Sequence, residues 1–487
     1  MSGTVRFDRR LVRLFVEASG DDHPIHTSRP FSRLTPYGEP IVHGVLQGLA
    51  ALAAVEQEPG WALRGVAFEF LGSAVPGVDY SLEVERLAED RVRVRMQDGR
   101  LPLLVANVAF ARAEEEAKGS AGDRPESAWT VRGAYRPDPE ALAAVMAILG
   151  LDRSRISERH VAALMWASFL VGVEYPHERI LLVGVKARFA AASRVVADTG
   201  FEGEAWLERA GERGDVAIEG RFGSGGRPFC ALRVTAARLA EAPGVPSAAR
   251  LREALEGSPA LDGRVALVVG GSRGLGAALA RGLALQGCRV FATHSRSEPA
   301  EAGVEWLRAD ARRHRDCERV ARHVLDRAGR LDVLVVNAWP SIRPLSMDPG
   351  SAPRARRHLS AGLAIVTEAM MTLVPLLAPA GGWNVLISSA YVGAPRPYFS
   401  HYIAGKAASE ALVRSAAVEH RTVRHLIVRP PKLRTHQTSS PLAGGAMEVE
   451  TVAAAVVRRL SAGQRPGEVS MLEEFVQAAI PTFQEPS

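Results

Sequence analysis

VALVVGGSRGLG, residues 265–276, joins a run of five apolar residues to a turn rich in glycine. The uninterrupted apolar run predicts a strand that is buried on both faces, as in a parallel sheet. Further apolar runs, separated by stretches with helical spacing, lie at residues 333–336, 385–387 and 426–428. Short buried strands that alternate with helices predict a doubly wound α/β domain, whose ligands bind at the carboxyl ends of the strands.

The glycine-rich turn has the features of a nucleotide-binding loop. Glycines let the backbone approach a pyrophosphate, which the N-terminus of the following helix attracts. Arg273 in the turn and Arg296 after the second strand, which has no acidic residue at its end, suit a phosphate on the ribose 2′ position. We therefore expect NADPH to be favoured over NADH. The predicted cofactor contacts in these segments are Gly270, Ser272, Arg273, Gly274, Leu275, Gly276, Arg296, Asp310, Asn337 and Ala338.

Tyr402 and Lys406 form a Tyr-x-x-x-Lys pair, which places both side chains on one face of a helix. Ser389 ends the strand that precedes this helix. A free tyrosine has a pKa of about 10, so a tyrosine that donates a proton near neutral pH needs nearby positive charge to lower its pKa. Lys406 and an oxidised nicotinamide would supply that charge. The pattern predicts carbonyl reduction with Tyr402 as the proton donor.

Together these motifs resemble the short-chain dehydrogenase/reductase family, including its ketoacyl reductases. The resemblance covers residues 261–487 and implies a Rossmann-like domain that binds a nicotinamide cofactor. It implies that Ser389 orients the carbonyl group of the substrate and that Tyr402 is the general acid/base. It also implies that Lys406 contacts the cofactor ribose and lowers the pKa of Tyr402, so that Tyr402 and Lys406 belong to the cofactor site as well.

Three positions depart from the family pattern. Trp339 replaces the glycine of the usual Asn-Asn-Ala-Gly, and Leu359 lies near the usual position of a fourth catalytic residue, an asparagine. Pro431 replaces the glycine of a Pro-Gly pair, which removes a backbone N–H where the family holds the nicotinamide carboxamide. We therefore expect an altered proton relay to solvent.

A second set of reactive side chains lies in SGDDHPIH, residues 19–26. Its glycine and proline predict an irregular loop, from which Asp21 and His26 can point into one cleft. Water addition to an enoyl thioester needs one group to activate water and one to exchange the α-proton; Asp21 and His26 suit these roles in either assignment. Negative charge develops on the thioester oxygen, for which the free N–H of Gly44, where an apolar helix begins, is a candidate donor.

SGDDHPIH followed by GEPIVHG, residues 38–44, resembles the signature of MaoC-like, (R)-specific enoyl hydratases. The resemblance implies that Asp21 and His26 are the catalytic pair and that Gly44 lines the oxyanion hole. His23 stands where the family usually has asparagine. That difference changes the hydrogen bonding around the pair but removes neither catalytic group.

Two successive segments each place extended runs after one apolar helix. The first has a helix at residues 42–55 and a later hairpin with an Asp98-Gly99 turn. The second has a helix near residues 163–171 that resembles the MaoC-like central helix but has no Asp-to-His loop before it. The repeat predicts an α+β double hot-dog fold. The expected boundaries are a catalytic hot dog at 1–112, a linker at 113–128, a degenerate hot dog at 129–240, a linker at 241–260 and the dehydrogenase domain at 261–487.

The composition is that of a globular enzyme. Of the 487 residues 47% are hydrophobic and 23% charged, and neither a signal peptide nor an uninterrupted membrane-length apolar run is evident, so we expect a cytoplasmic protein. The three scattered cysteines predict buried free thiols and no metal site. The net charge of +6 permits an acidic partner, but the basic run at 308–330 has the spacing of a solvated helix, so we expect no nucleic-acid binding.

The two chemistries share an intermediate. Reduction of a 3-oxoacyl thioester gives a 3-hydroxyacyl thioester, and its dehydration gives a 2-enoyl thioester. The sequence favours this reductive order, as in fatty-acid or polyketide synthesis, with the substrate on acyl carrier protein or coenzyme A. One alternative is a degradative enoyl-CoA hydratase with an NAD-dependent 3-hydroxyacyl-CoA dehydrogenase, and another is a hydratase with a non-catalytic cofactor-binding scaffold. We expect a homodimer or larger assembly.

Overall fold

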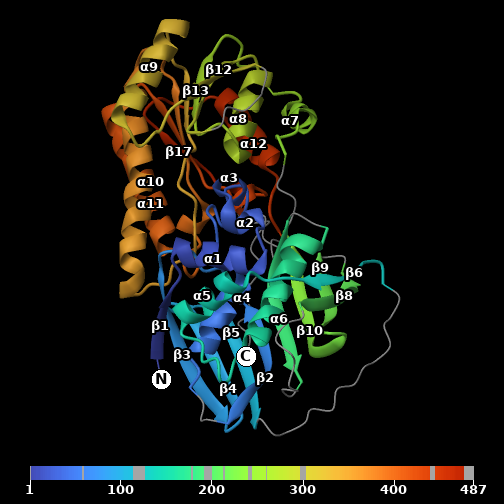
Figure 1. Cartoon of the computed structure of the whole chain (residues 1–487). Helices are drawn as coiled ribbons and strands as arrows, with labels where there is room; N and C mark the ends of the chain where they lie inside the picture. The colour runs from blue at the N-terminus through green and yellow to red at the C-terminus, as the bar shows by residue number, and fades with distance from the viewer. Residues whose placement is uncertain are drawn as a thin grey trace. The chain divides into compact units, whose positions relative to one another are not determined.

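The computed structural model describes residues 2–56, 60–112, 127–176, 179–190, 200–211, 214–239, 244–258, 260–296, 303–438 and 445–475 (Figure 1). The chain divides into two compact units, Met1–Glu241 and Ala242–Ser487. The expected linker at 113–128 falls almost wholly outside the described residues, as does the start of the one at 241–260. The domain boundaries within these units remain predictions.

The first unit is built on a ten-stranded antiparallel sheet, in the order β1-β3-β4-β5-β2-β7-β10-β9-β8-β6. Its order divides it into two five-stranded halves, which meet where β2 pairs with β7 from Gly65 opposite Arg188 to Glu69 opposite Gly184. The strands are β1 (Ser2–Arg6), β2 (Trp61–Phe70), β3 (Asp79–Ala88), β4 (Arg91–Asp98), β5 (Leu101–Arg112), β6 (Thr130–Tyr135), β7 (Ile180–Phe189), β8 (Phe201–Ala210), β9 (Asp215–Ser224) and β10 (Arg227–Arg238).

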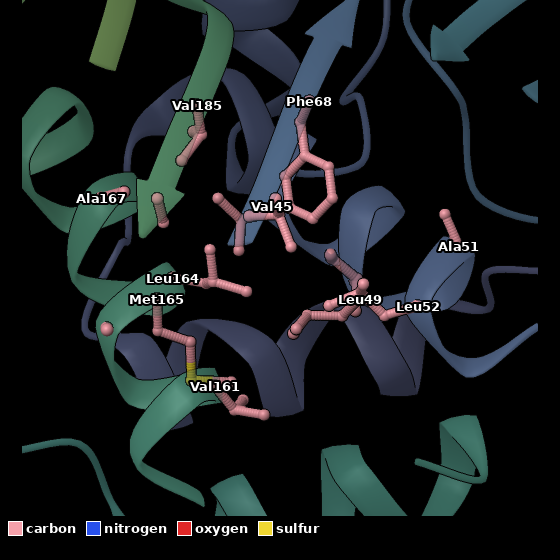
Figure 2. Close-up of a cluster of buried hydrophobic side chains, with 14 of the residues drawn as sticks. Val45, Leu49, Ala51, Leu52, Phe68, Val161, Leu164, Met165, Ala167 and Val185 are labelled. Carbon is pink, nitrogen blue, oxygen red and sulfur yellow. The ribbon is translucent and has the colours of Figure 1, made fainter. Parts of the chain in front are cut away.

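Each half of this sheet has one helix that is buried along most of its length, α4 (Gly44–Ala53) in the first half and α6 (Glu158–Phe169) in the second. Their apolar side chains belong to one hydrophobic core that both halves share. Figure 2 shows Val45 and Leu49 of α4 and Leu164 of α6 with Phe68 and Val185 from the two strands that join the halves. The other helical elements are α1 (Arg9–Ser19), α2 (Pro24–Thr27), α3 (Arg29–Ser32), α5 (Pro139–Leu149) and a π-helical turn, η1 (Leu170–Glu174).

The sequence predictions omit α1, β6 and β9, for physical reasons that differ. In α1, charged residues alternate locally with apolar ones, although Leu11, Val12 and Phe15 lie on one buried face. The strand β9 contains glycine and charged residues, which are depleted in strands, and β6 is a short edge strand. The expected loop after residue 19 contains the short helix α2, because Pro24 occupies its first turn, where no N–H is needed.

The second unit confirms the predicted doubly wound domain. Its seven described strands are all parallel, in the order β13-β12-β11-β14-β15-β16-β17. The strands are β11 (Val265–Val269), β12 (Arg289–His294), β13 (Val304–Arg308), β14 (Val333–Val336), β15 (Trp383–Ile387), β16 (Arg424–Val428) and β17 (Val469–Leu472). The helices are α7 (Ala248–Leu255), α8 (Gly274–Leu285), α9 (His314–Ala328), α10 (Ala352–Leu373), α11 (Ser400–Glu419) and α12 (Val449–Ser461), with short 3-10 turns η2 (Pro349–Ser351), η3 (Val374–Ala380), η4 (Ala390–Val392) and η5 (His436–Thr438).

Alternate residues of the parallel strands enter two separate hydrophobic cores, because side chains of a strand point to opposite faces in turn. Val268 and Val335 pack with α7, α8 and α12 on one face. Leu267 and Leu334 pack with α9, α10 and α11 on the other. Both faces are therefore covered, which is why the central strands β11 and β14 have no polar residues in alternation.

The predicted solvated helix in the basic run is confirmed as α9, in which Val320 and Val324 are buried. The three cysteines, Cys230, Cys288 and Cys317, are free and buried, also as predicted. Among the described residues one helical segment, Pro349–Ala380, is long and apolar enough to cross a membrane by length and composition alone. This is weak evidence for a membrane span, because the segment contributes buried residues to the core of the second unit.

Candidate active sites

The predicted N-terminal catalytic loop lies between α1 and α2. Gly20 ends α1 in the left-handed conformation (φ 69°), which glycine adopts without strain. His23 caps α2, since its Nδ1 accepts a hydrogen bond from the N–H of Ile25 at 3.2 Å. The histidine at the usual asparagine position therefore serves as a helix cap, and Asp21 projects from the turn between the two helices.

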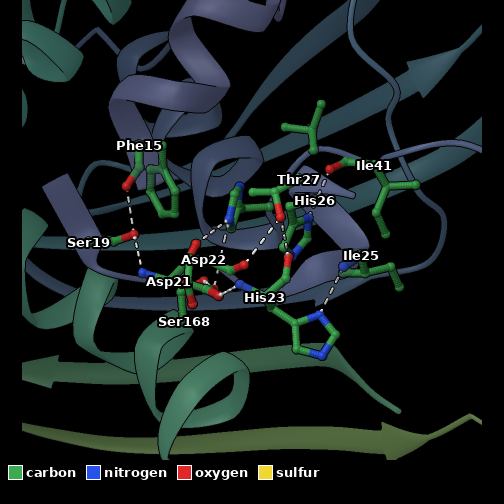
Figure 3. Close-up of polar contacts among 12 residues, drawn as sticks. Phe15, Ser19, Asp21, Asp22, His23, Ile25, His26, Thr27, Ile41 and Ser168 are labelled. Carbon is green, nitrogen blue, oxygen red and sulfur yellow. Dashed lines mark hydrogen bonds and ion pairs between the residues drawn. The ribbon is translucent and has the colours of Figure 1, made fainter. Parts of the chain in front are cut away.

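Asp21 is buried, and both halves of the first unit surround it. Its Oδ2 accepts a 2.6 Å hydrogen bond from the hydroxyl group of Ser168 on α6, and its Oδ1 lies 3.3 Å from the N–H of His23 (Figure 3). The backbone of Gly172 in η1 also approaches the Asp21 carboxylate, because a Cβ at that position would overlap it. The phenol of Tyr135 on β6 also donates to the carbonyl of Ser19 at 2.9 Å. The second half thus fixes the catalytic loop.

His26 is held in one tautomer by the backbone. Its Nδ1 lies 2.8 Å from the carbonyl oxygen of Ile41, which can only accept, so Nδ1 carries the proton and Nε2 keeps its lone pair (Figure 3). His43 stacks on His26 with ring centroids 3.7 Å apart, and its Nε2 donates to the carbonyl of Asp21 at 3.0 Å. The predicted pair, Asp21 and His26, is therefore brought together, with His43 as a third member.

Burial decides the charge of these histidines. It lowers the pKa of His43 to about 3 and, together with the neighbouring His43, lowers the pKa of His26 well below its usual value. Both rings are consequently neutral near pH 7, and His26 can accept a proton through Nε2. Gly44 is the first residue of α4, so its N–H has no partner within the helix, which is what an oxyanion donor requires.

The same three side chains also have the composition of a metal site. Asp21, His26 and His43 each offer one ligand atom within 4.8 Å of the others. Two of these groups are already engaged, because the Asp21 carboxylate accepts the Ser168 hydroxyl and the His43 Nε2–H faces a carbonyl oxygen. The His43 Nδ1, by contrast, has no hydrogen-bond partner among the described residues.

Sequence reasoning missed Ser168, His43 and Gly172 as members of this site. Two signals were available, since Ser168 lies in the stretch that resembles the MaoC-like central helix and His43 precedes the predicted oxyanion donor. The distance between Ser168 and Asp21, 147 positions along the chain, explains why no local pattern joins them. Only the pairing of the two sheet halves brings α6 to the loop.

In the second unit the glycine-rich turn is tied to the strands on either side. The N–H of Gly270 donates to Oγ1 of Thr293 at 2.9 Å, and the Asn337 amide donates to the carbonyl of Gly270 at 2.8 Å. Gly270 has φ +83°, and a Cβ there would lie 2.7 Å from that of Ala338. A Cβ at Gly276 would overlap the Gly270 carbonyl. The turn is therefore a close-packed backbone cradle before α8, which suits a pyrophosphate.

The remaining predicted cofactor contacts surround this turn. Ser272, Arg273, Gly274 and Leu275 lead into α8, and Arg273 and Arg296 lie close enough for their charges to interact. Desolvation first, and then the charge of Arg296, lowers the pKa of Arg273. Asp310 is engaged by Arg312, whose guanidinium donates at 2.6 and 2.9 Å and lowers the pKa of the carboxyl group.

Ser389, Tyr402 and Lys406 lie together at the carboxyl end of β15 and the start of α11. A hydrogen bond joins the side chains of Tyr402 and Ser389, and Lys406 donates to the carbonyl of Ile387 at 2.8 Å. The expected lowering of the tyrosine pKa is not seen, since burial raises the pKa of Tyr402 to about 12. The physical reason is that burial also lowers the pKa of Lys406 to about 7, and its amine is directed elsewhere.

The three departures from the family pattern differ in their surroundings. Trp339 reaches the predicted catalytic residues, with its ring 4.2 Å from the Lys406 Nζ and 6.1 Å from the Tyr402 ring. Leu359 lies on α10, and one of its methyl groups would be 3.4 Å from a Cβ at Gly405 on α11. Pro431 follows Pro430, whose carbonyl accepts from the N–H of Ala390 at 3.0 Å beside Ser389.

Comparison with known proteins assigns a class to each unit. Residues 3–108 match the model of the MaoC like domain, and residues 264–442 match that of the short chain dehydrogenases. The chain therefore contains a MaoC-like domain and a short chain dehydrogenase domain.

Individual relatives match only part of the chain. L-fucose dehydrogenase of Mus musculus is 29% identical over 164 residues, which are 32% of this chain and 60% of the relative. The chain thus spans about three fifths of that enzyme's length. A putative ketoacyl reductase 2 of the granaticin polyketide synthase from Streptomyces violaceoruber is 33% identical over 26% of this chain and 55% of the relative. An alcohol dehydrogenase structure from Thermococcus sibiricus, complexed with 5-hydroxy-NADP, has 25% identity and a TM-score of 0.40, covering 46% of this chain and 99% of its own.

Proposed function

We propose that the chain carries out two consecutive steps on an acyl thioester: NADPH-dependent reduction of a 3-oxoacyl group to a 3-hydroxyacyl group, and dehydration of that product to a 2-enoyl group. The observation that carries the proposal is the presence of a neutral, oriented imidazole beside a buried carboxylate in the MaoC-like domain. The second domain has the Ser-Tyr-Lys set that the preceding reduction needs.

For dehydration, His26 is the group that takes the α-proton of the 3-hydroxyacyl thioester through its free Nε2. The Cα–H and Cβ–O bonds break and a Cα=Cβ double bond forms; the protonated Nε2 of His26 then gives the proton to the departing hydroxyl group, which leaves as water. Asp21, fixed by Ser168, orients the departing hydroxyl group. The N–H of Gly44 faces the charge that develops on the thioester oxygen, and such donors typically contribute about 3–4 kcal/mol to the barrier.

The fold of the first unit that best fits these features is a double hot dog. Two five-stranded halves, each with one buried helix, share a single core. The first half would hold the Asp21–His26 pair, and the second would supply Ser168 and Gly172 to it. The degenerate half is then part of the active site, and domain boundaries near residues 112, 129, 240 and 261 follow from this reading.

For reduction, Ser389 would orient the 3-oxo group and Tyr402 would give it a proton. Bound NADPH supplies a hydride to the carbonyl carbon. The glycine cradle formed by Gly270 and Gly276 suits the pyrophosphate of a dinucleotide, and Lys406, whose amine donates to the Ile387 carbonyl here, would contact the ribose. The mutually close cations Arg273 and Arg296 favour a 2′-phosphate, and hence NADPH over NADH.

The reductive direction suits synthesis of a fatty acid or polyketide, with the substrate on acyl carrier protein or coenzyme A. The similarity to a ketoacyl reductase of a polyketide synthase supports that direction. A measured preference for NADPH would support it too, because the degradative alternative would use NAD as an oxidant.

The test combines the two steps in one assay. The purified chain is incubated with acetoacetyl-CoA and either NADPH or NADH, while nicotinamide absorbance and product mass are followed. The intact chain should consume NADPH and release the enoyl thioester. Asp21→Asn should stop at the hydroxyacyl thioester, and Tyr402→Phe should consume no cofactor. The matched controls are Asp22→Asn and Tyr398→Phe, which alter exposed neighbours of the same residue type.

Each alternative gives a different result in this assay. Dehydration of a supplied 3-hydroxyacyl thioester without any cofactor oxidation would leave a hydratase with a non-catalytic second domain. A preference for NAD and for hydration of enoyl-CoA would support the degradative enzyme. Failure of both steps would refute the proposed function.

A further inference from the structure

Trp339 occupies an unusual place among the side chains of the second unit. It follows Asn337 and Ala338 at the end of β14, and its ring lies between α10 and α11 beside Tyr402. The Tyr402 ring meets it nearly edge-on, with an interplanar angle of 76°. The buried indole Nε1–H has no hydrogen-bond partner among the described residues. The ring is therefore not held there by a polar contact, which would be the usual reason to bury an indole N–H.

Two glycines inside neighbouring helices make room for this ring. A Cβ at Gly362 in α10 would overlap the indole, and a Cβ at Gly405 in α11 would lie 2.8 Å from it. Glycine in a helix interior costs about 0.5–1 kcal/mol relative to alanine. Both helices accept that cost at the positions that face Trp339. The indole, Gly362 and Gly405 thus form one matched set that packing of the helices alone would not require.

The face of the indole is directed at Lys406. The amine of Lys406 lies 4.2 Å from the ring centroid, well within the range of a cation–π contact, and donates to the carbonyl of Ile387. Lys406 is only 3% exposed, and its neighbour one turn on, Glu410, is already paired with Arg429 and Ser388. Glu410 raises the pKa of Lys406 even so, and the Tyr402 ring lies 5.9 Å from the amine. The indole is the nearer of the two uncharged rings that face the ammonium.

We propose that Trp339 is a positioning residue for Lys406: the indole face holds the ammonium charged and aimed at the cofactor ribose. This role rests on the proposed reductase function. Leu359, on the same helix as Gly362, stands near the usual position of a polar residue of the proton relay and cannot bind water. The contact between Trp339 and Lys406 takes over part of the role of that relay. A cation–π contact in a desolvated place favours the charged amine, which opposes the effect of burial.

The experiment measures NADPH affinity of the full chain between pH 6 and 9.5 by fluorescence titration, so that turnover is not needed. Affinity should fall on the alkaline side as Lys406 loses its charge. Trp339→Met fills the space but removes the π face. It should move this fall down by about one pH unit and weaken binding at pH 7.5 about tenfold. Trp339→Phe keeps a ring and should recover most of both effects. Trp61→Phe, in the first unit, is the matched control.

A double-mutant cycle tests the packing of the set separately. Gly362→Ala should lower Tm in the intact chain because the new methyl group overlaps the indole. In a Trp339→Ala background the same change should raise Tm, since alanine favours the helix. A change of the same sign in both backgrounds would show that the glycine does not serve the ring.

The outcomes distinguish failure of the proposed reductase function from failure of the proposed role of Trp339. If the intact chain binds neither NADPH nor NADH, the proposed reductase fails and this role of Trp339 fails with it. If the intact chain binds NADPH but Trp339→Met changes neither the affinity nor its fall at alkaline pH, only the proposed role of Trp339 is refuted. An upward shift of the alkaline limb in Trp339→Met would likewise overturn the proposal, because the ring would then act only by excluding water.

Discussion

The two candidate sites differ in how completely the chain itself prepares their reactive groups. In the MaoC-like domain, hydrogen bonds from Ser168 and to Ile41 fix the carboxylate and the imidazole, and the imidazole is neutral. In the dehydrogenase domain, burial raises the pKa of Tyr402 to about 12 and lowers that of Lys406 to about 7. The first site has its proton acceptor ready, whereas the second still needs positive charge beside its tyrosine.

The presence of a sequence motif and a site with prepared reactive groups are therefore separate properties. The Tyr-x-x-x-Lys pair is present on α11, yet the amine of Lys406 faces a carbonyl oxygen and the indole of Trp339. The nicotinamide ring becomes positively charged as it gives up its hydride and would then bring the missing charge, so the proposed reductase would depend on its cofactor for acid/base tuning as well as for the hydride.

The largest effect is expected from His26→Ala. Removing the proposed proton acceptor should lower dehydration and hydration rates by about 10³-fold, since general-base catalysis contributes about 10²–10⁴-fold. NADPH-dependent reduction in the other unit should be unchanged. The measurement follows both reactions with separate substrates, a 3-hydroxyacyl and a 3-oxoacyl thioester. If His26→Ala still hydrates the enoyl thioester, the base is Asp21 and not His26. The contrast drawn between the two sites would then be wrong.

The next effect tests whether the second half of the sheet takes part in catalysis. Ser168→Ala removes the 2.6 Å hydrogen bond to Asp21, so the carboxylate loses its orientation. We expect kcat for hydration to fall about 10- to 100-fold with little change in KM, the usual cost of a misplaced catalytic group. Ser154→Ala is the matched control, because Ser154 makes an equally short hydrogen bond to Asp152 on the exposed surface. Equal effects of both changes would argue for general destabilisation.

Much of this architecture could be predicted from the sequence, because the signals are local. The runs at 265–269 and 333–336 coincide with β11 and β14, and the Tyr402–Lys406 spacing places both residues on one helix. Ser168 could not be predicted, since the pairing of β2 with β7 brings it to Asp21. The direction of the Lys406 amine was also out of reach, because it depends on side-chain packing between two helices.

A smaller effect, a loss of folding stability, is expected when the pH is lowered. His43 has a folded-state pKa of about 3, below the usual 6.5, so the unfolded chain binds a proton first as pH falls. Stability should therefore be lost progressively from pH 6.5 towards 3, by on the order of 3 kcal/mol at pH 4 from this residue alone. His43→Gln keeps a donor for the Asp21 carbonyl but does not titrate. It should flatten the fall of Tm between pH 7.5 and 4.5 relative to the exposed control His314→Gln, and an unchanged slope would contradict the buried neutral histidine.

The smallest effect, on the hydration rate, is expected from chelation of metal ions. Asp21, His26 and His43 could ligate a metal by distance, but a metal would compete with the Ser168 hydroxyl and the hydrogen bond of His43. Prolonged dialysis against EDTA should therefore change the hydration rate less than about twofold, because His26 needs only its lone pair to take the proton. Loss of activity that Zn²⁺ restores would make the first site a metal centre. The contrast would then be reversed, since both sites would depend on a group that the chain does not itself provide.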